Sequence, residues 1–392
     1  MMEPINIGVI GLGNMGLLHS EWLKRSDRFR LIAVADVDEE RTASVAEEGI
    51  RAFSSGSTLL RSKAMRSSLE AVLIATPHYD HTVLGIKALN LGFNVLIEKP
   101  ISVDKRDAER LLAAFTGTDL VFGAMFNQRV HPAYRYLKEV LQAETFGALR
   151  RFSWTITDWF RSQRYFDSGG WRATWSGEGG GVLLNQAPHQ LDLLTWLFGS
   201  PNAVFAECGF GRWHNIDVED EVHAVLKYDQ GVTGSFITST GEAPGHNILD
   251  VVCDRATLTF EMGAPLRIQR NALSITESIE NNRPFEKPAV KIEEISFEGD
   301  GGQHRTILDN FARAVRGEEP LIAPGVEGIS SVELANAMLL SGGSGQVVQL
   351  PLDAGRYRRW LNGQKRSEKQ SLRKGKNPHG GSVTDLSGSF GT

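Results

Sequence analysis

The segment INIGVIGLGNMG, residues 5–16, decides the fold of the first part of the chain. Its apolar run, 5–10, is typical of a buried strand, and the glycines after it follow the pattern G-x-G-x-x-G. Gly11 permits the tight turn out of the strand, Gly13 lets the backbone approach a pyrophosphate, and Gly16 lets the next helix pack closely on the sheet. The helix start, at Asn14 and Met15, offers N–H groups to phosphates. We therefore predict a dinucleotide site here.

Asp36 specifies which dinucleotide is expected. It follows a second apolar run, 31–35, and stands twenty residues after Gly16. A carboxylate at this distance accepts hydrogen bonds from a ribose 2′-hydroxyl and repels a 2′-phosphate. The expected cofactor is therefore NAD rather than NADP. The alternative to a dinucleotide site is a glycine-rich turn that binds no ligand. Such a turn requires neither the helix that follows it nor the acid at position 36.

The composition limits the compartment and the partners. The chain has 392 residues, enough for two domains, and its formal net charge of −5 gives no reason to expect nucleic acid or a membrane surface as a partner. Its two cysteines, Cys208 and Cys253, build no disulfide framework and suit a reducing compartment. No signal peptide is visible, and no apolar run approaches the ~20 residues that span a bilayer. We expect a cytoplasmic protein.

Two domains and a tail are predicted. Strand runs at 72–75, 95–97 and 121–126 alternate with helical patterns, which predicts an α/β domain with a doubly wound parallel sheet over residues 1–127. Period-two segments between 203 and 260 predict an antiparallel or mixed sheet in a second, α+β domain, 128–362. We expect one long helix over 184–197, and helices near 306–315 and 326–340 to close this domain. Residues 365–392 contain few apolar side chains and are predicted to be a disordered tail.

Two motifs lie where strands of the parallel sheet end, the edge at which such sheets bind ligands. They are Thr76-Pro77-His78 and Glu98-Lys99-Pro100. Lys99 can hydrogen-bond a substrate hydroxyl, and its charge favours a developing alkoxide; a solvated lysine at a strand end is the alternative. Cofactor contacts are expected from this edge at Thr76, Pro77, His78, His81, Glu98 and Lys99.

A triple glycine, 179–181, precedes three polar residues spaced as on one helix face. Asn185, His189 and Asp192 stand at i, i+4 and i+7. A histidine near its ordinary pKa of about 6.5 suits general-base chemistry at neutral pH, although a structural histidine is the alternative. No second histidine lies at helical spacing, so no metal is expected.

Aromatic and charged side chains gather between residues 158 and 175. Aromatic faces stack on the C–H faces of sugars, and Arg and Asp hold hydroxyls in fixed directions. These tryptophans could equally pack on the domain or at a subunit contact, and Arg129 could bind a carboxylate between domains. The expected substrate contacts are Lys99, Asn127, Arg129, Asp158, Trp159, Arg161, Tyr165, Trp171, Arg172, Asn185, His189 and Asp192.

The order of four motifs resembles the glucose–fructose oxidoreductase / inositol dehydrogenase (Gfo/Idh/MocA) family over roughly residues 5–362. The motifs are GLGNMG at 11–16, ATPH at 75–78, EKP at 98–100 and GGGVLLNQAPHQLD at 179–192. The resemblance implies a Rossmann domain followed by a domain with a large, mostly antiparallel open sheet. The face of this sheet commonly forms subunit contacts, hence a homodimer or homotetramer. It also implies that Lys99 orients a substrate hydroxyl and that His189 shuttles its proton.

Asn185 departs from the family pattern, in which many members carry an aspartate four residues before the histidine. An amide orients a hydroxyl but does not raise the basicity of a histidine as a carboxylate does. Members with the Asn-Gln-x-Pro-His form resemble dehydrogenases of glycosides, anhydrosugars and related pyranoses. We therefore expect an NAD-dependent dehydrogenase that oxidises a secondary hydroxyl of such a sugar, or of an inositol, by hydride transfer to nicotinamide. The alternatives are a redox-neutral glycosidase or lyase that uses bound NAD, and a non-catalytic dinucleotide sensor.

Overall fold

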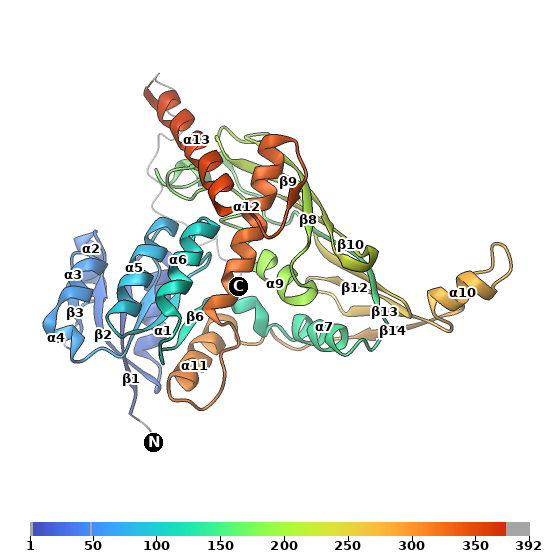
Figure 1. Cartoon of the computed structure of the whole chain (residues 1–392). Helices are drawn as coiled ribbons and strands as arrows, with labels where there is room; N and C mark the ends of the chain where they lie inside the picture. The colour runs from blue at the N-terminus through green and yellow to red at the C-terminus, as the bar shows by residue number, and fades with distance from the viewer. Residues whose placement is uncertain (1–2, 48, 374–392) are drawn as a thin grey trace.

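The first domain is built on a six-stranded parallel sheet (Figure 1). The structure, a computed structural model, describes residues 3–47 and 49–373. The strands, in spatial order, are β3 (Arg51–Phe53), β2 (Phe29–Ala35), β1 (Ile5–Ile10), β4 (Ala71–Ile74), β5 (Asn94–Ile97) and β6 (Phe122–Ala124). The helices are α1 (Asn14–Lys24), α2 (Glu39–Val45), α3 (Gly56–Arg61), α4 (Lys63–Arg66), α5 (His78–Asn90) and α6 (Lys105–Phe115). The doubly wound sheet predicted for this domain is confirmed.

Burial on both faces explains why these strands are continuous apolar runs. Every residue of β4 is fully buried, as expected for a parallel sheet covered by helices on both sides. In the pairing of β1 with β4, Ile10 lies opposite Ile74, so the turns that follow these two strands lie side by side. The edge strand β3 was not predicted, because it has three residues and two of them are exposed.

The second domain is built on a nine-stranded sheet. In spatial order its strands are β14 (Val290–Ile295), β13 (Leu266–Asn271), β12 (Ala256–Glu261), β11 (Asn247–Cys253), β7 (Leu149–Ile156), β10 (Thr233–Ser239), β9 (Glu219–Lys227), β8 (Ala203–Phe210) and β15 (Val348–Gln349). Only β7 and β10 pair in parallel; the other neighbours are antiparallel. The prediction of a mostly antiparallel open sheet is confirmed.

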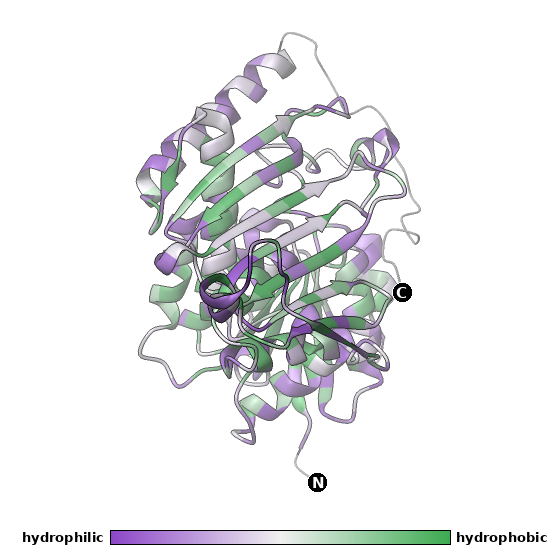
Figure 2. Cartoon of the chain, turned by 90° about the vertical axis from the view of Figure 1, so that its right-hand side faces the viewer, coloured by the Kyte–Doolittle hydropathy of each residue, from purple (hydrophilic) through white to green (hydrophobic). Residues whose placement is uncertain are grey.

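Helices cover one face of this sheet and leave the other exposed. The covering helices are α7 (Pro132–Gln142), α9 (Pro188–Phe198) and α12 (Gly328–Ser344), and their core includes the buried Trp154 and Phe236. Side chains on the outer face alternate with the buried ones; Phe205 and Val225 there are 43% and 46% exposed. Figure 2 shows most of these strands with no helix in front of them. The shorter elements are η1 (Asn127–Val130), α8 (Gln163–Asp167), η2 (Asp229–Gly231), α10 (Ile275–Asn281) and η3 (Gly325–Glu327).

Helix α11 (Gln303–Val315) belongs to the core of the first domain, although the sequence predicted a helix closing the second domain. Its buried Ile307 and Phe311 pack into that core. Just beyond it, Arg316 donates from Nη1 to Oε1 of Glu70 at 2.7 Å. The chain therefore returns to the parallel sheet after the nine-stranded sheet is complete.

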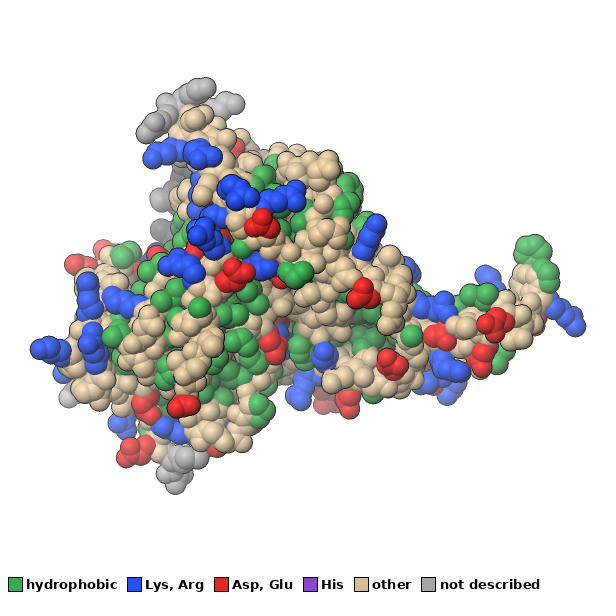
Figure 3. All heavy atoms as spheres, viewed as in Figure 1, with side chains coloured by type: hydrophobic (Ala, Val, Ile, Leu, Met, Phe, Trp, Pro, Cys, Tyr) green, Lys and Arg blue, Asp and Glu red, His purple; other side chains and the backbone are tan. Residues whose placement is uncertain are grey.

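Helix α13 (Ala354–Arg373) corrects the prediction of disorder from residue 365. Tyr357 and Leu361 are fully buried, one turn apart, and Glu368 further along is 5% exposed. Carboxylate oxygens of Glu368 accept from the backbone N–H groups of Trp175 at 2.6 Å and Ser176 at 3.0 Å. Figure 3 shows Lys and Arg side chains exposed along this helix, which made the segment resemble a solvated tail. The remainder of the predicted tail, 374–392, lies outside the described residues.

No helix among the described residues combines the length and the apolar character needed to cross a bilayer.

Candidate active site

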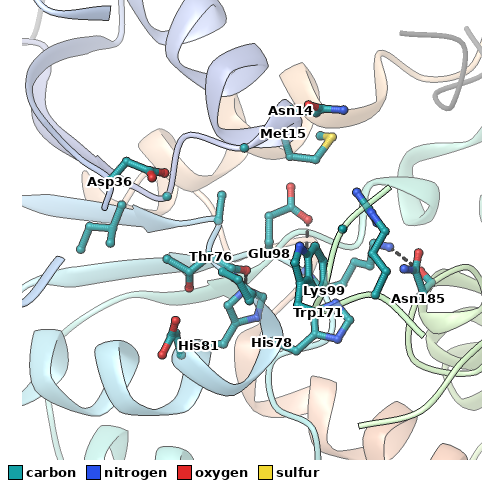
Figure 4. A pocket seen from close by; sticks show the side chains of 18 of the residues that line it. Asn14, Met15, Asp36, Thr76, His78, His81, Glu98, Lys99, Trp171 and Asn185 are labelled. Carbon is teal, nitrogen blue, oxygen red and sulfur yellow. Dashed lines mark hydrogen bonds between the residues drawn. The ribbon is translucent and has the colours of Figure 1, made fainter. Parts of the chain in front are cut away.

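A cavity of about 1070 Å³ opens at the carboxyl edge of the parallel sheet and is lined by both domains (Figure 4). Most of the predicted site residues line it. From the first domain these are Gly11, Gly13, Asn14, Met15, Asp36, Thr76, Pro77, His78, His81, Glu98 and Lys99, and from the second Trp159, Arg161, Tyr165, Trp171, Arg172, Asn185 and His189. The two domains therefore bring together segments that are far apart in the sequence.

The glycine-rich turn fits a pyrophosphate. Gly11 has φ +91°, and a Cβ there would lie 2.6 Å from the carbonyl oxygen of Ala75. A Cβ on Gly16 would lie 1.8 Å from the carbonyl oxygen of Gly11, so Gly16 serves packing and does not line the cavity. At Gly13, by contrast, nothing lies within 4 Å of the Cβ position. The turn therefore leaves open space at the N-terminus of α1, where phosphates are favoured.

Asp36 is fixed at the end of β2, at one end of the cavity (Figure 4). Its Oδ2 accepts from the N–H of Leu12 at 2.5 Å, and its Oδ1 accepts from the N–H of Asp38 at 2.9 Å. Sequence reasoning missed Ser55 and Arg41, which line the same end. The capping box that starts α3 pairs Ser55 with Thr58 rather than with a Glu or Gln, so the sequence does not carry the usual signature of such a box.

The residues that follow β4 line the cavity, and one of them also contacts backbone carbonyl oxygens. Thr76 lines the cavity, and its Oγ1 is buried without a hydrogen-bond partner, so it suits a polar ligand. His78 lines the cavity, and burial lowers its pKa well below the usual range. His81 also lines the cavity, and its ring nitrogens lie 2.8 Å from the carbonyl oxygen of Pro100 and 2.7 Å from that of Thr76. His81 therefore joins two loops of the cavity wall.

Glu98 supports the loop that carries Lys99. Its Oε1 lies 2.6 Å from Nε2 of His19, and its Oε2 accepts from the N–H of Lys99 at 3.1 Å. Burial opposes ionisation of Glu98, but the hydrogen bond and charge of His19 outweigh it and lower the pKa to about 2. Glu98 is therefore a buried carboxylate engaged by the protein itself.

Lys99, Asn185 and Glu178 form a continuous chain of contacts. Lys99 Nζ donates to the carbonyl oxygen of Asn185 at 2.8 Å, and Asn185 Nδ2 donates to the carboxylate of Glu178 (Figure 4 draws the first of these). Burial lowers the pKa of Lys99 and raises that of Glu178 to about 7. Glu178 also accepts from the N–H of Ala173 at 2.6 Å. Sequence reasoning missed Glu178, although it directly precedes the triple glycine.

His189 lines the same cavity as Lys99 and Asn185. It lies in the first turn of α9, which begins at Pro188. Burial and then the charge of Lys99 lower the pKa of His189 well below its usual range, and its Nδ1 has no hydrogen-bond partner. The predicted helix over 184–197 was therefore too long: Asn185 lies in the turn before α9, since a proline opens this helix.

Four expected substrate contacts do not line the cavity. Arg129 donates from Nε and Nη2 to Asp192 at 2.8 and 2.6 Å, and both side chains are buried. Asn127 bonds Gln303 on α11. Asp158 is exposed at the end of β7. The expectation that these four residues contact substrate is corrected, and the alternative that Arg129 binds a carboxylate is the arrangement observed.

The triple glycine is required by close approach to β9. A Cβ on Gly181 would lie 1.9 Å from the carbonyl oxygen of Glu219, and Gly179 has φ +83°. The buried carboxylate of Glu219 accepts from the N–H groups of Gly181 at 2.8 Å and Leu183 at 3.0 Å. Burial raises the pKa of Glu219 to about 7. Glu219 thus positions the turn that carries Asn185.

His304, at the start of α11, is the other functional candidate that sequence reasoning missed. It lines the cavity, and its ring packs against His19 and Trp22 with centroids 5.7 and 5.4 Å away. Burial lowers its pKa to about 4, so it is neutral at neutral pH. No motif surrounds it, and only the return of α11 to the first domain brings it here. Gln128 and Gln186 line the cavity as well.

Within residues 3–47 and 49–373, no group of three or more His, Cys, Asp or Glu side chains is arranged to hold a metal ion.

Comparison with known proteins identifies both domains. Residues 5–126 match the oxidoreductase family NAD-binding Rossmann fold, and residues 134–259 match the GFO/IDH/MocA C-terminal domain. The chain is 31% identical over 244 residues to 1-carboxy-3-chloro-3,4-dihydroxycyclohexa-1,5-diene dehydrogenase of Comamonas testosteroni, covering 61% of this chain and 58% of that one. It is 27% identical over 275 residues to levoglucosan dehydrogenase of Pseudarthrobacter phenanthrenivorans, covering 63% of this chain and 70% of that one. Among solved structures, the WlbA dehydrogenase of Chromobactrium violaceum, in complex with NADH and UDP-GlcNAcA, matches this structure with a TM-score of 0.75 at 26% identity. The match covers 90% of this chain and 98% of that one.

Proposed function

The chain belongs to the GFO/IDH/MocA family of NAD-binding oxidoreductases, and on that premise we propose that it is an NAD-dependent dehydrogenase of a pyranose-like sugar, anhydrosugar or glycoside. One observation carries the proposal: Lys99 and a half-buried His189, whose pKa is lowered, line the same cavity as the dinucleotide turn. When bound, NAD supplies the acceptor for the hydride that leaves the substrate carbon.

His189 takes the proton of the substrate hydroxyl in this mechanism. Its lowered pKa keeps the ring neutral at neutral pH, so that it can accept a proton, and its Nδ1 has no competing partner in the protein. Lys99 donates a hydrogen bond to the same hydroxyl oxygen and stabilises the negative charge that develops on it. Asn185 holds the ammonium group of Lys99 through its carbonyl oxygen.

The ring of the sugar lies against the second domain. Trp159, Tyr165 and Trp171 supply apolar faces in the cavity wall, and Arg161 and Arg172 supply donors beside them. The levoglucosan dehydrogenase relative, by its name, acts on an anhydrosugar, which supports a pyranose-like substrate here.

The test measures the absorbance of the reduced nicotinamide, NADH from NAD and separately NADPH from NADP, across pyranoses, anhydrosugars, glycosides and inositols. We expect NADH to form with NAD and one of these classes. Lys99→Met should lower kcat about 100- to 1,000-fold, the range lost with one transition-state donor, while NADH binding stays intact. Lys63→Met, at an exposed lysine of α4, is the matched control. Normal turnover by Lys99→Met, or substrate consumption without NADH, would contradict the proposal.

We also propose that two or four copies assemble through the outer face of the nine-stranded sheet. Phe205 and Val225 are exposed apolar side chains on that face, and such patches favour association. Light scattering should give the mass of a dimer or tetramer, and Phe205→Lys should reduce it. A monomeric mass at micromolar concentration would contradict the assembly.

A further inference from the structure

Two arginines of the second domain line the cavity without an ion-pair partner among the described residues. Arg161 Nη1 donates to the carbonyl oxygen of its neighbour Phe160 at 3.0 Å, and its Nε is buried with no acceptor. Arg172 Nη1 donates only to a phenol oxygen. The buried Arg129, by contrast, is matched by Asp192 at 2.6 Å. Both side chains are half-buried in the cavity wall, and because a buried donor such as Nε of Arg161 is normally paired, they are suited to an acceptor that the protein itself does not supply.

The acids closest to this pair do not neutralise it. Glu178 acts on Arg172 and Asp158 acts on Arg161 through space, but neither forms an ion pair with it. The carboxylate of Glu178 already accepts hydrogen bonds from the backbone N–H of Ala173 and from the side-chain amide of Asn185. Asp158 is exposed. Neither of these two acids therefore pairs with the positive charge of Arg161 or Arg172.

Tyr165 connects both arginines to the proposed reaction centre. Its ring centroid lies 5.2 Å from Cζ of Arg161 and 5.1 Å from Cζ of Arg172. Arg172 donates to the Tyr165 hydroxyl at 3.2 Å, and that hydroxyl donates to Oδ1 of Asn185 at 3.4 Å. Asn185 in turn holds Lys99. The two guanidinium groups are thereby linked to Asn185 and Lys99, which lie across the cavity from Asp36, the acid expected at the ribose (Figure 4).

We propose that the substrate carries an oxyanion, a carboxylate or a phosphate group, that Arg161 and Arg172 bind while Lys99 and His189 engage the hydroxyl to be oxidised. The inference rests on the proposed function and names the substrate class of the same site. A guanidinium fork matches the two oxygens of such a group, and stacking on an aromatic ring holds the fork in place. The substrate class is thus an acidic sugar, such as a uronic acid, or a sugar phosphate.

The test compares matched pairs of substrates. Glucuronate with glucose and galacturonate with galactose examine a carboxylate, and glucose 6-phosphate with glucose examines a phosphate. We expect kcat/KM for one anionic class to exceed that of its neutral partner about 10- to 100-fold, the value of one charge-assisted hydrogen bond. Arg161→Met and Arg172→Met should each raise KM for the anion by a similar factor and leave KM for NAD unchanged. Arg164→Met, at an exposed arginine of the same segment that does not line the cavity, is the matched control.

The outcomes separate this inference from the proposed function. If neutral sugars are oxidised with the same kcat/KM as their anionic partners, the inference is overturned and the dehydrogenase assignment stands. The same holds if the two arginine variants raise KM for NAD and not KM for the anion. If no compound yields NADH, the proposed function fails, and calorimetry on the NADH complex decides the oxyanion site separately. Binding of glucuronate or glucose 6-phosphate that Arg172→Met abolishes supports the site, and binding of neither anion overturns it.

Discussion

Replacing Arg129 with methionine tests whether its ion pair with Asp192 is structural. Three donors of the guanidinium group are engaged: two bond Asp192, and Nη1 bonds the carbonyl oxygen of Ile322 at 3.2 Å and the carboxylate of Glu327. The side chains of Arg129 and Asp192 are 2% and 1% exposed. The pair joins η1 to α9 behind the cavity, so it fixes the helix that carries the proposed base.

The magnitude follows from burial. Removing one partner of a buried ion pair leaves the other charge uncompensated and typically costs about 3–5 kcal/mol of stability, and methionine preserves most of the apolar contact of the arginine stem. Burial already raises the pKa of Asp192, and loss of Arg129 raises it further. The ionised carboxylate is then the destabilising form, so stability falls as pH rises toward the folded-state pKa. We expect a smaller loss at pH 5 than at pH 8.

Urea unfolding followed by the fluorescence of the eight tryptophans measures this loss. Arg28→Met is the control, because Arg28 lies 4.0 Å from Glu318 in an exposed pair and should cost less than about 1 kcal/mol. Adding Asp192→Asn to Arg129→Met should recover most of the stability, since no charge is then buried alone. Wild-type stability together with a raised substrate KM would refute the structural assignment and return Arg129 to the substrate.

Three further results are expected. Because the pKa of Glu178 is raised to about 7, Glu178→Gln should remove an inflection near pH 7 from the profile of kcat/KM while NADH affinity holds, and an unchanged inflection would separate Glu178 from the reaction. Gly181→Ala, whose Cβ would meet the Glu219 carbonyl oxygen at 1.9 Å, should lower activity at least about 10-fold, whereas Gly170→Ala, with nothing within 4 Å, should be tolerated; equal activity of the two would contradict the packing argument. Asp36→Ser should raise the ratio of kcat/KM for NADP over NAD at least about 10-fold, because a 2′-phosphate no longer meets a carboxylate, and an unchanged ratio would place the ribose elsewhere.

The first sheet was predictable because its signals are local. Buried parallel strands must be apolar throughout, and the glycines mark positions where a Cβ would strike the backbone, so both leave a direct trace in the sequence. The place of α11 left no such trace. Its amphipathic pattern predicts a helix but not which of two apolar cores receives it, and that choice depends on the nine-stranded sheet that intervenes.

The end of the chain shows how composition misleads. Residues 365–373 are polar except for Leu372, which predicted disorder, yet the buried face of α13 needs only Tyr357, Leu361 and one acid at helical spacing. Glu368 is held by N–H groups from a distant loop, near Trp175, rather than by apolar contact. A polar helix anchored through hydrogen bonds lacks the hydrophobic periodicity on which sequence prediction depends.

The positions of Lys99 and His189 at one cavity were predictable from motifs at a strand end and beside a glycine turn, but their partners were not. The expected face of three polar residues failed because Pro188 begins the helix, so Asn185 and Asp192 point to different environments. The side chain of Asp192 meets Arg129, and that of Asn185 reaches the cavity.

The amide at position 185 and the acid at 178 make one arrangement. Asn185 Nδ2 donates to the buried Glu178, and its backbone oxygen accepts from Lys99. An aspartate at 185, the common choice in the family, would place two carboxylates within hydrogen-bond distance of each other, and one of them would have to hold a proton. Asparagine avoids that conflict and connects the lysine to an acid through two successive hydrogen bonds. The departure from the family pattern therefore goes together with Glu178, whose carboxyl group acts on the charge of Lys99 alongside that of Glu98.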